Sequence, residues 1–181
     1  MPTQVLETTA AQEPLEAVAP EQAVAIPLTI KSGFVVGRGD TLGQIGSSGK
    51  YRRRGRSTVI STAFTTGSPN GRVIPGSFVP GDILTNAAGA SVGTILSIAN
   101  DGVVTLTANA AVAVANGQSI LASDGSQIAV CIADEGSDGV GDTTIRAFIG
   151  GYFDATRISD LDASALSELG GTLRPGNIFR F

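Results

Sequence analysis

Short apolar runs separated by glycine-rich turns dominate the chain from about residue 25 onward. The runs are rich in Val, Ile and Thr and are too short for helices, which is the pattern of β-strands. They predict strands at 25–30, 33–36, 42–45, 58–61, 82–86, 91–98, 103–108, 119–122, 127–133 and 143–150. The chain is therefore expected to be mainly β.

Two turns connect pairs of these strands. Asn100-Asp101-Gly102 predicts a hairpin between 91–98 and 103–108, because Asp and Gly accept the positive φ of tight turns. A second Gly/Asp turn at 138–142 separates the strand that ends at residue 133 from the strand that starts at residue 143. Both connections predict antiparallel pairs.

One short helix is expected near the C-terminus. Ser159 and Asp162 have the spacing of a capping box, and the apolar residues that follow fall on one helical face before Gly170-Gly171. A final extended segment, interrupted by Pro175-Gly176, is expected after the helix.

Residues 1–26 are expected to form an extended acidic arm. The first 30 residues contain four glutamates and four prolines but no glycine, lysine or arginine, so their formal charge is −4. Such a segment has too little apolar surface for a core, and it is either a floppy tail or an arm that adds a strand to a partner. The residues expected to make that contact are Val18, Val24, Ile26, Pro27 and Leu28.

The middle of the chain, residues 62–121, has its own strands and very few charges. Its charged residues are Arg72, Asp82 and Asp101. We interpret it as an inserted small β-module, with the middle of one continuous barrel as the alternative. The predicted division is an arm at 1–26, a core at 27–61 and 122–181, and an insertion at 62–121.

Composition narrows the possible chemistry. The chain has no histidine, which excludes Ser-His-Asp and Cys-His nucleophile systems and His-ligated zinc. Cys131 lies within an apolar run and is expected to be a buried small side chain. Lys50 follows two serines, but nothing in the sequence orients a Ser/Lys pair for catalysis. We therefore expect neither an enzyme nor a bound cofactor.

Four acidic residues crowd into one glycine-containing loop: Asp134, Glu135, Asp138 and Asp142. Such a loop could coordinate a hard cation, but its spacing does not match an EF-hand loop. An exposed hairpin turn is the preferred interpretation, so no metal site is expected.

The strongest charge feature is a basic run formed by Lys50, Arg52, Arg53, Arg54 and Arg56. Residues 31–56 hold seven basic residues and one acidic residue, a formal charge of +6. The run is expected to form a basic patch for an acidic partner or a neighbouring subunit, whose acidic arm is a candidate; a phosphate-binding patch and a solvated loop are the alternatives. Because the chain has few aromatic residues and no long apolar stretch, we expect it to bind neither nucleic acid nor membrane.

The order of several segments carries a family resemblance. Residues 39–45, GDTLGQI, followed by SGKY at 48–51, resemble the opening of the lambda-type phage head decoration proteins. Residues 124–135, DGSQIAVCIADE, are similar to that family's strand with an acidic end, and 144–151, TIRAFIGG, to its paired strand ending in glycine. The closing helix and final strand from residue 153 onward are similar too.

The resemblance implies a β-clip-like head decoration fold with one short C-terminal helix. It also implies a homotrimer that binds the major capsid protein on the outside of an expanded phage head, at local three-fold positions, and stabilises the head against internal DNA pressure. Such a protein is made in the host cytoplasm and ends on the outer surface of the virion. The chain departs from the family pattern in its arginine run and its long 62–121 segment. The alternative function is a capsid-displayed module, formed by 62–121, that binds a host surface or a glycan.

Overall fold

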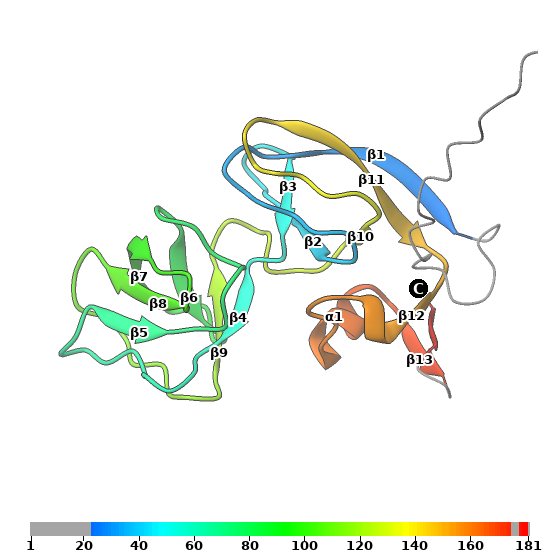
Figure 1. Ribbon diagram of the computed structural model, residues 1–181. Helices are drawn as coiled ribbons and strands as arrows, with labels where there is room; N and C mark the ends of the chain where they lie inside the picture. Colours follow the sequence, from blue (N-terminus) through cyan, green and yellow to red (C-terminus); the bar gives the residue numbers. More distant parts are fainter. Residues whose placement is uncertain (1–22, 175–177, 181) are drawn as a thin grey trace, which may run out of the picture.

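The computed structural model describes residues 23–174 and 178–180. Strands make up most of its regular structure, so the protein is mainly β (Figure 1). The described strands form a closed barrel, a six-stranded sheet and a three-stranded sheet. No helix in this part of the chain has the length and apolar character needed to cross a membrane.

The barrel draws its strands from both halves of the chain. Its strands, in spatial order, are β1 (Val24–Ile30), β11 (Thr143–Gly150), β10 (Cys131–Ala133), β2 (Thr41–Gln44) and β3 (Tyr51–Arg53). The antiparallel pair β1–β11 is the longest, and a parallel bridge from Ile30 to Tyr51 closes the barrel. Alternate side chains point inward and make an apolar interior: Leu28, Ile30, Phe34, Val36, Leu42, Ile45, Cys131, Ala133, Ile145 and Ala147.

Residues 56–122, called the module below, form a sheet of their own. Its strands, in spatial order, are β4 (Arg56–Thr58), β9 (Ser119–Ala122), β6 (Ile83–Asn86), β7 (Ser91–Ile98), β8 (Val103–Leu106) and β5 (Asn70–Arg72). The module has a separate apolar core that includes Phe64, Leu84 and Ile120. The first and last of its strands, β4 and β9, pair with each other, so the chain enters and leaves the module at one place.

The C-terminal residues cover the outside of the barrel. They comprise β12 (Tyr152–Asp154), a 3-10 turn (Ala155–Arg157), α1 (Ala163–Glu168), β13 (Thr172–Arg174) and β14 (Ile178–Arg180). Phe153 and Ile158 pack on Ile132 and Phe148, whose side chains point out of the barrel. The rings of Phe148 and Phe153 lie 5.1 Å apart. This C-terminal cap and the module lie on different sides of the barrel (Figure 1).

Most predicted strands are confirmed, three of them at their expected bounds: 91–98, 119–122 and 143–150. The hairpin around Asp101 joins β7 to β8 as expected. The strand expected at 33–36 is wrong, because Gly33 turns with a φ of 89° and Val36 makes only an isolated bridge. Strands β3, β5 and β12 were not expected, because each has only three residues and contains polar ones, so no alternation of apolar and polar residues can be seen in the sequence.

The predicted helix exists, but it starts later than its expected cap. Asp162, not Ser159, is the N-cap, and its carboxylate accepts a hydrogen bond from the Ala165 amide. Asp160 lies between these two residues and has a φ of 60°, so a helix cannot run from Ser159 through to Asp162. Ser159 instead donates its amide to the Gly39 carbonyl and ties the chain to the barrel.

The boundaries of the expected parts also shift. Strand β1 begins at Val24 and pairs with β11 as far as Gly150, so residues 24–26 belong to the barrel and not to an arm. The module begins at Arg56 rather than at residue 62.

Cys131 gives a simple test of the barrel interior. Its side chain is buried, as expected, and burial raises the pKa of its thiol to about 12. We predict that the folded protein does not react with a thiol reagent at about pH 8, and that the reaction becomes fast after unfolding in denaturant. A folded protein that reacts as fast as the unfolded chain would contradict this packing.

Candidate functional site: an arginine junction

Four arginines line the connection between the barrel and the module. Arg52 and Arg53 belong to β3, Arg54 follows directly, and Arg56 begins β4. Their side chains reach carboxylates of the module and of the C-terminal cap. We call these four residues and their carboxylate partners the arginine junction.

Arg52 joins the barrel to the module. Its guanidinium is fully buried and forms a fork with Asp82 of the module, with Nη1–Oδ1 and Nη2–Oδ2 distances of 2.8 and 2.7 Å. Nη2 also donates to the Ser77 carbonyl at 2.6 Å, and Nη1 donates to Asp124 at 3.1 Å. The guanidinium carbon lies 4.0 Å from the centre of the Phe34 ring. Such a planar, bidentate and stacked site suits arginine and not lysine.

Asp124 stays charged beside Arg52. Burial alone would raise the pKa of Asp124, but hydrogen bonds from Ser126 and the nearby guanidinium outweigh it and lower the pKa below its ordinary value. Asp82 is also held from the other side, since the Val79 amide donates to its Oδ2 at 3.0 Å. The buried positive charge is therefore matched by two oriented carboxylates.

Arg53 and Arg54 join the barrel to the C-terminal cap. Arg53 Nε donates to Asp160 Oδ2 at 2.7 Å. Arg54, which is 2% exposed, donates from Nη1 to Asp162 and from Nη2 to Glu168, both at 3.0 Å. These carboxylates lie at the start and end of α1, so the short helix is fixed at both ends.

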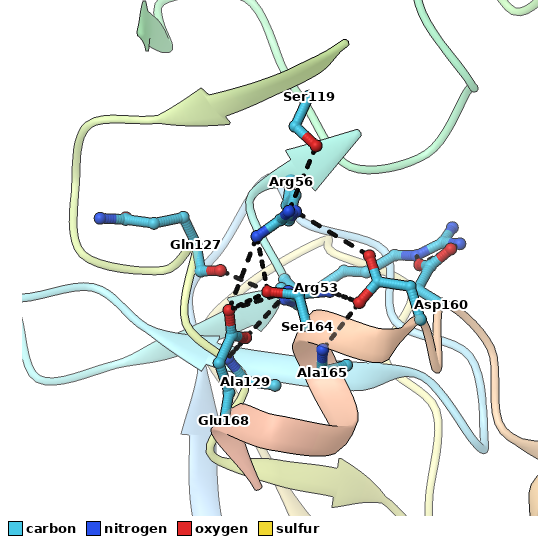
Figure 2. A network of polar contacts seen from close by, with 11 residues as sticks. Arg53, Arg56, Ser119, Gln127, Ala129, Asp160, Ser164, Ala165 and Glu168 are labelled. Atoms are coloured by element: carbon cyan, nitrogen blue, oxygen red, sulfur yellow. Dashed lines mark hydrogen bonds and ion pairs between the residues drawn. The ribbon is translucent and has the colours of Figure 1, made fainter. Parts of the chain in front are cut away.

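Arg56 completes the junction between the module and α1. Figure 2 shows its guanidinium between Ser119 of β9 and Ser164 of α1, with donor–acceptor distances of 3.2 and 2.7 Å. Glu168 also accepts from the Ser164 hydroxyl and the Ala129 amide. One network therefore connects the module, the helix and the segment leading into β10.

The expectation of a basic surface patch is wrong for most of the run. Arg52 and Arg54 are buried, and carboxylates of the same chain pair with Arg53 and Arg56. Lys50 is the most exposed member and pairs with Asp142. The acidic partners of the run are thus internal, and no neighbouring acidic arm is needed to balance it.

The acidic loop is organised by ion pairs and turn contacts. Asp134 is buried and pairs with Arg38 and Arg146. Glu135 accepts the Arg146 amide, and Asp138 accepts the Val140 amide. Among residues 23–174 and 178–180, no group of three or more Cys, Asp or Glu side chains is placed to hold a metal ion.

The residues expected to contact a partner lie along β1, with one exception. Val24 and Ile26 are partly exposed at the start of the strand, Pro27 is exposed, and Leu28 is buried in the barrel. Val18 lies outside the described residues. Within the described part, β1 pairs with β11 along one edge and reaches β3 along the other only at Ile30. The first half of β1 is therefore an edge strand.

The arginine junction links separate parts of the fold. Each guanidinium is engaged by carboxylates or carbonyl oxygens, and the network connects elements that are far apart in the sequence. Truncating one member of a buried pair leaves an uncompensated charge, so relative movement of the parts is costly. The junction is suited to holding the barrel, module and cap as one body.

Comparisons with family models, with curated proteins and with solved structures find no match to this chain.

We predict a characteristic pH dependence of stability from the same carboxylates. The pKa of Asp162 is lowered because its hydrogen bond from Ala165 and the charges of Arg54 and Arg56 outweigh the effect of burial, and Asp124 behaves alike. Their contribution is present above the unfolded pKa and is lost as the pH falls through the lower folded pKa. The free energy of unfolding should stay flat from about pH 5 to 8, since the chain has no histidine, and should fall below about pH 4.

Chemical denaturation at a series of pH values measures this profile. Asp124→Asn should have a shallower acid limb than the unmodified protein. A loss of stability centred near neutral pH would contradict the assignment.

Proposed function

We propose that the protein is a structural virion component that binds the outside of an expanded phage capsid as a trimer at local three-fold positions and stabilises the head against internal DNA pressure. One observation carries the proposal: the separate segments that resemble head decoration proteins come together in one barrel. Residues 39–45 contain β2, 124–135 contain β10, and 144–151 contain most of β11. In the barrel β2 pairs with β10, and β10 pairs with β11.

A glycine of the resembling segment has a specific reason to be there. A Cβ atom at Gly43 would lie 1.8 Å from the Ser126 carbonyl oxygen, so the turn at 124–127 passes directly over β2. Any larger residue would push two of the resembling segments apart. Residues 39–45 and 124–127 therefore pack directly against each other. This contact supports treating the two segments as parts of one fold into which the module is inserted.

The position of β1 supports binding through the N-terminal segment. Residues 1–22 lead directly into the edge strand, whose exposed side chains include Val24 and Ile26. We expect this proline- and glutamate-rich segment to bind by adding to the edge of a partner's sheet. In a trimer, each bound segment raises the effective concentration of the other two, so release is slow although each contact is weak.

Co-sedimentation with empty shells tests the proposal. The purified protein is mixed with matching shells before and after expansion, and the bound copies are counted per major capsid subunit. We expect saturable binding to expanded shells alone. Binding to neither form, or equal binding to both forms, would contradict the proposal.

A second candidate function concerns the module, which is a separately cored unit with adjoining entry and exit strands. Such a unit suits display of a host-surface or glycan-binding site. To test this, residues 59–118 are replaced by a two-residue turn that joins Thr58 to Ser119, which already face each other in the β4–β9 pair. The same variant carries Arg52→Leu, because the replacement removes Asp82 and Ser77, which bind Arg52, and would leave its charge unpaired. Thermal unfolding establishes that the variant is folded. This candidate predicts unchanged shell binding and lost adsorption of the virion to cells; unchanged adsorption would contradict it.

A further inference from the structure

An open cavity of about 310 Å³ lies beside the arginine junction, where the module meets the C-terminal cap. Strand β4, Ile74 and Ser77 line it from the module, and residues 160–162 line it from the cap. Its volume equals that of about ten liquid water molecules and falls at the lower end of the range for small-molecule sites. None of the lining residues belongs to β1, so this junction cavity is separate from the edge strand described above.

The charged side chains that line the junction cavity balance one another. They are two arginines and two aspartates: Arg54, Arg56, Asp160 and Asp162. Positive and negative groups also alternate at short range, since Arg56 Nε lies 3.9 Å from Asp162 Oδ2. A free anion or cation would therefore meet a like charge beside each favourable one. This wall favours an uncharged ligand that both donates and accepts hydrogen bonds.

Two hydroxyl groups of the wall have no hydrogen-bond partner in the described part of the chain. Ser77 is only 5% exposed and its carbonyl binds Arg52, but its hydroxyl is unpaired. Thr58, on β4, is partly buried and its hydroxyl is also unpaired. A buried hydroxyl without a partner costs free energy. A ligand in the cavity can supply the missing hydrogen bonds.

A donor and an acceptor face each other elsewhere on the same wall. Arg56 uses its two terminal nitrogens for serine hydroxyls, which leaves Nε (Figure 2). Asp162 uses Oδ1 for the helix cap and for Arg54, which leaves Oδ2. The 3.9 Å between Nε and Oδ2 is too long for a hydrogen bond. A hydroxyl group placed between these atoms can accept from Nε and donate to Oδ2.

The junction cavity also has an apolar part and a fixed shape. Ile74 and Leu161 are the apolar lining residues. The Ser57 hydroxyl donates to the Ile74 carbonyl at 2.9 Å, and the Ile74 amide donates to the Thr58 carbonyl at 3.1 Å. These bonds hold the wall in place before anything binds, so little order has to be gained on binding.

We propose that the junction cavity binds one ring of a neutral sugar. Every sugar hydroxyl both donates and accepts, so neighbouring hydroxyls of a ring match the alternating groups of the wall, while ring C–H groups pack on Ile74 and Leu161. No aromatic side chain is among the described lining residues, so we expect weak binding, with a Kd of about 1–10 mM. The proposal deepens the second candidate function and rests on it for the source of the sugar.

Saturation-transfer-difference NMR of the full chain tests sugar binding directly. The probes are the methyl glycosides of glucose, galactose, mannose and N-acetylglucosamine, each titrated to about 50 mM, which covers millimolar affinities. We expect saturable transfer to the ring protons of at least one of them, and neither phosphate nor acetate should displace it. A shift in thermal unfolding is not used as the readout, because concentrated sugars stabilise proteins without binding to a site.

A pair of conservative substitutions locates the binding site. Thr58→Val/Ser77→Ala removes the two unpaired hydroxyls with little change of shape and should weaken sugar binding by about 10-fold. Thr66→Val/Ser91→Ala makes the same chemical change at exposed positions outside the cavity and should bind like the unmodified protein. Thermal unfolding without sugar establishes that each variant is folded. If the double variant does not fold, Ser77→Ala alone should weaken binding by about 3-fold.

Three results would overturn the proposal: no saturable transfer from any of the four glycosides, unchanged affinity of the Thr58→Val/Ser77→Ala protein, or displacement of the sugar by phosphate. Adsorption of virions that carry this variant is measured separately. Sugar binding with unchanged adsorption would retain the junction cavity and remove the second candidate function. Lost adsorption after replacement of the module, without sugar binding by the unmodified protein, would have the opposite meaning.

Discussion

Replacing Arg52 by alanine should lower the free energy of unfolding by about 3–5 kcal/mol, because it leaves two carboxylates without their positively charged partner beside a closed apolar interior. Asp82 loses both bonds of its fork, and Asp124 loses its guanidinium partner. The Ser77 carbonyl loses its donor as well. Denaturation followed separately by barrel and module probes should also show reduced coupling between the two parts.

Arg72→Ala is the matched control for this substitution. It removes an arginine–aspartate pair of the same kind from an exposed site, where the side chains of Arg72 and Asp101 are 36% and 55% exposed. The expected loss is below about 1 kcal/mol. A double-mutant cycle of Arg52→Ala with Asp82→Ala should give a coupling of about 1–3 kcal/mol. An Arg52→Ala protein as stable as the Arg72→Ala protein would show that the junction does not hold the parts together.

Deleting residues 1–22 should abolish binding to expanded shells while leaving a folded protein. The deletion stops before Val24, because β1 begins there and its pairing with β11 must be kept. Loss of three tethered contacts should weaken binding by about 100-fold or more. Quantitative co-sedimentation measures the affinity, and thermal unfolding measures the integrity of the barrel.

The control for this deletion keeps length and charge constant. A protein with residues 1–22 in scrambled order retains all four glutamates but loses any side-chain register. It should bind as weakly as the deletion if the segment adds a specific strand. Full binding by the deleted protein would show that the N-terminal segment is not the attachment, and strong binding by the scrambled protein would reduce its role to charge.

A strand was predictable where one of its faces is buried, so that apolar and polar residues alternate, and where the turn beside it is formed by neighbouring residues such as Asp and Gly. Strand β7 and the Asp101 hairpin are examples, since alternation and a Gly-containing turn lie within a few residues of each other. Strand β3 was missed because its arginines read as solvated residues, although Arg52 is fully buried. Strand propensities treat arginine as a solvent-exposed residue. Arg52 can be buried in a strand because it pairs with Asp82 and Asp124, which are distant in the sequence.

The arginine junction itself was beyond local reasoning. Arg53 pairs with Asp160, a residue 107 positions away, and no spacing rule connects the two. The +6 of residues 31–56 was matched from the sequence with the acidic arm of a neighbouring subunit, but an acidic excess also lies in the C-terminal third of the same chain. That signal predicts mutual attraction, but it cannot say which arginine meets which carboxylate.

The pairing of the first described strand with one of the later strands sets an order of events on the ribosome. The module, whose strands are contiguous in the chain, can complete its core as soon as residue 122 has emerged. Strand β1 must wait for β11, and Arg54 must wait for Asp162 and Glu168. We therefore expect a nascent chain to carry a folded module beside an open half-barrel, because β1 precedes the module and its partner β11 follows it.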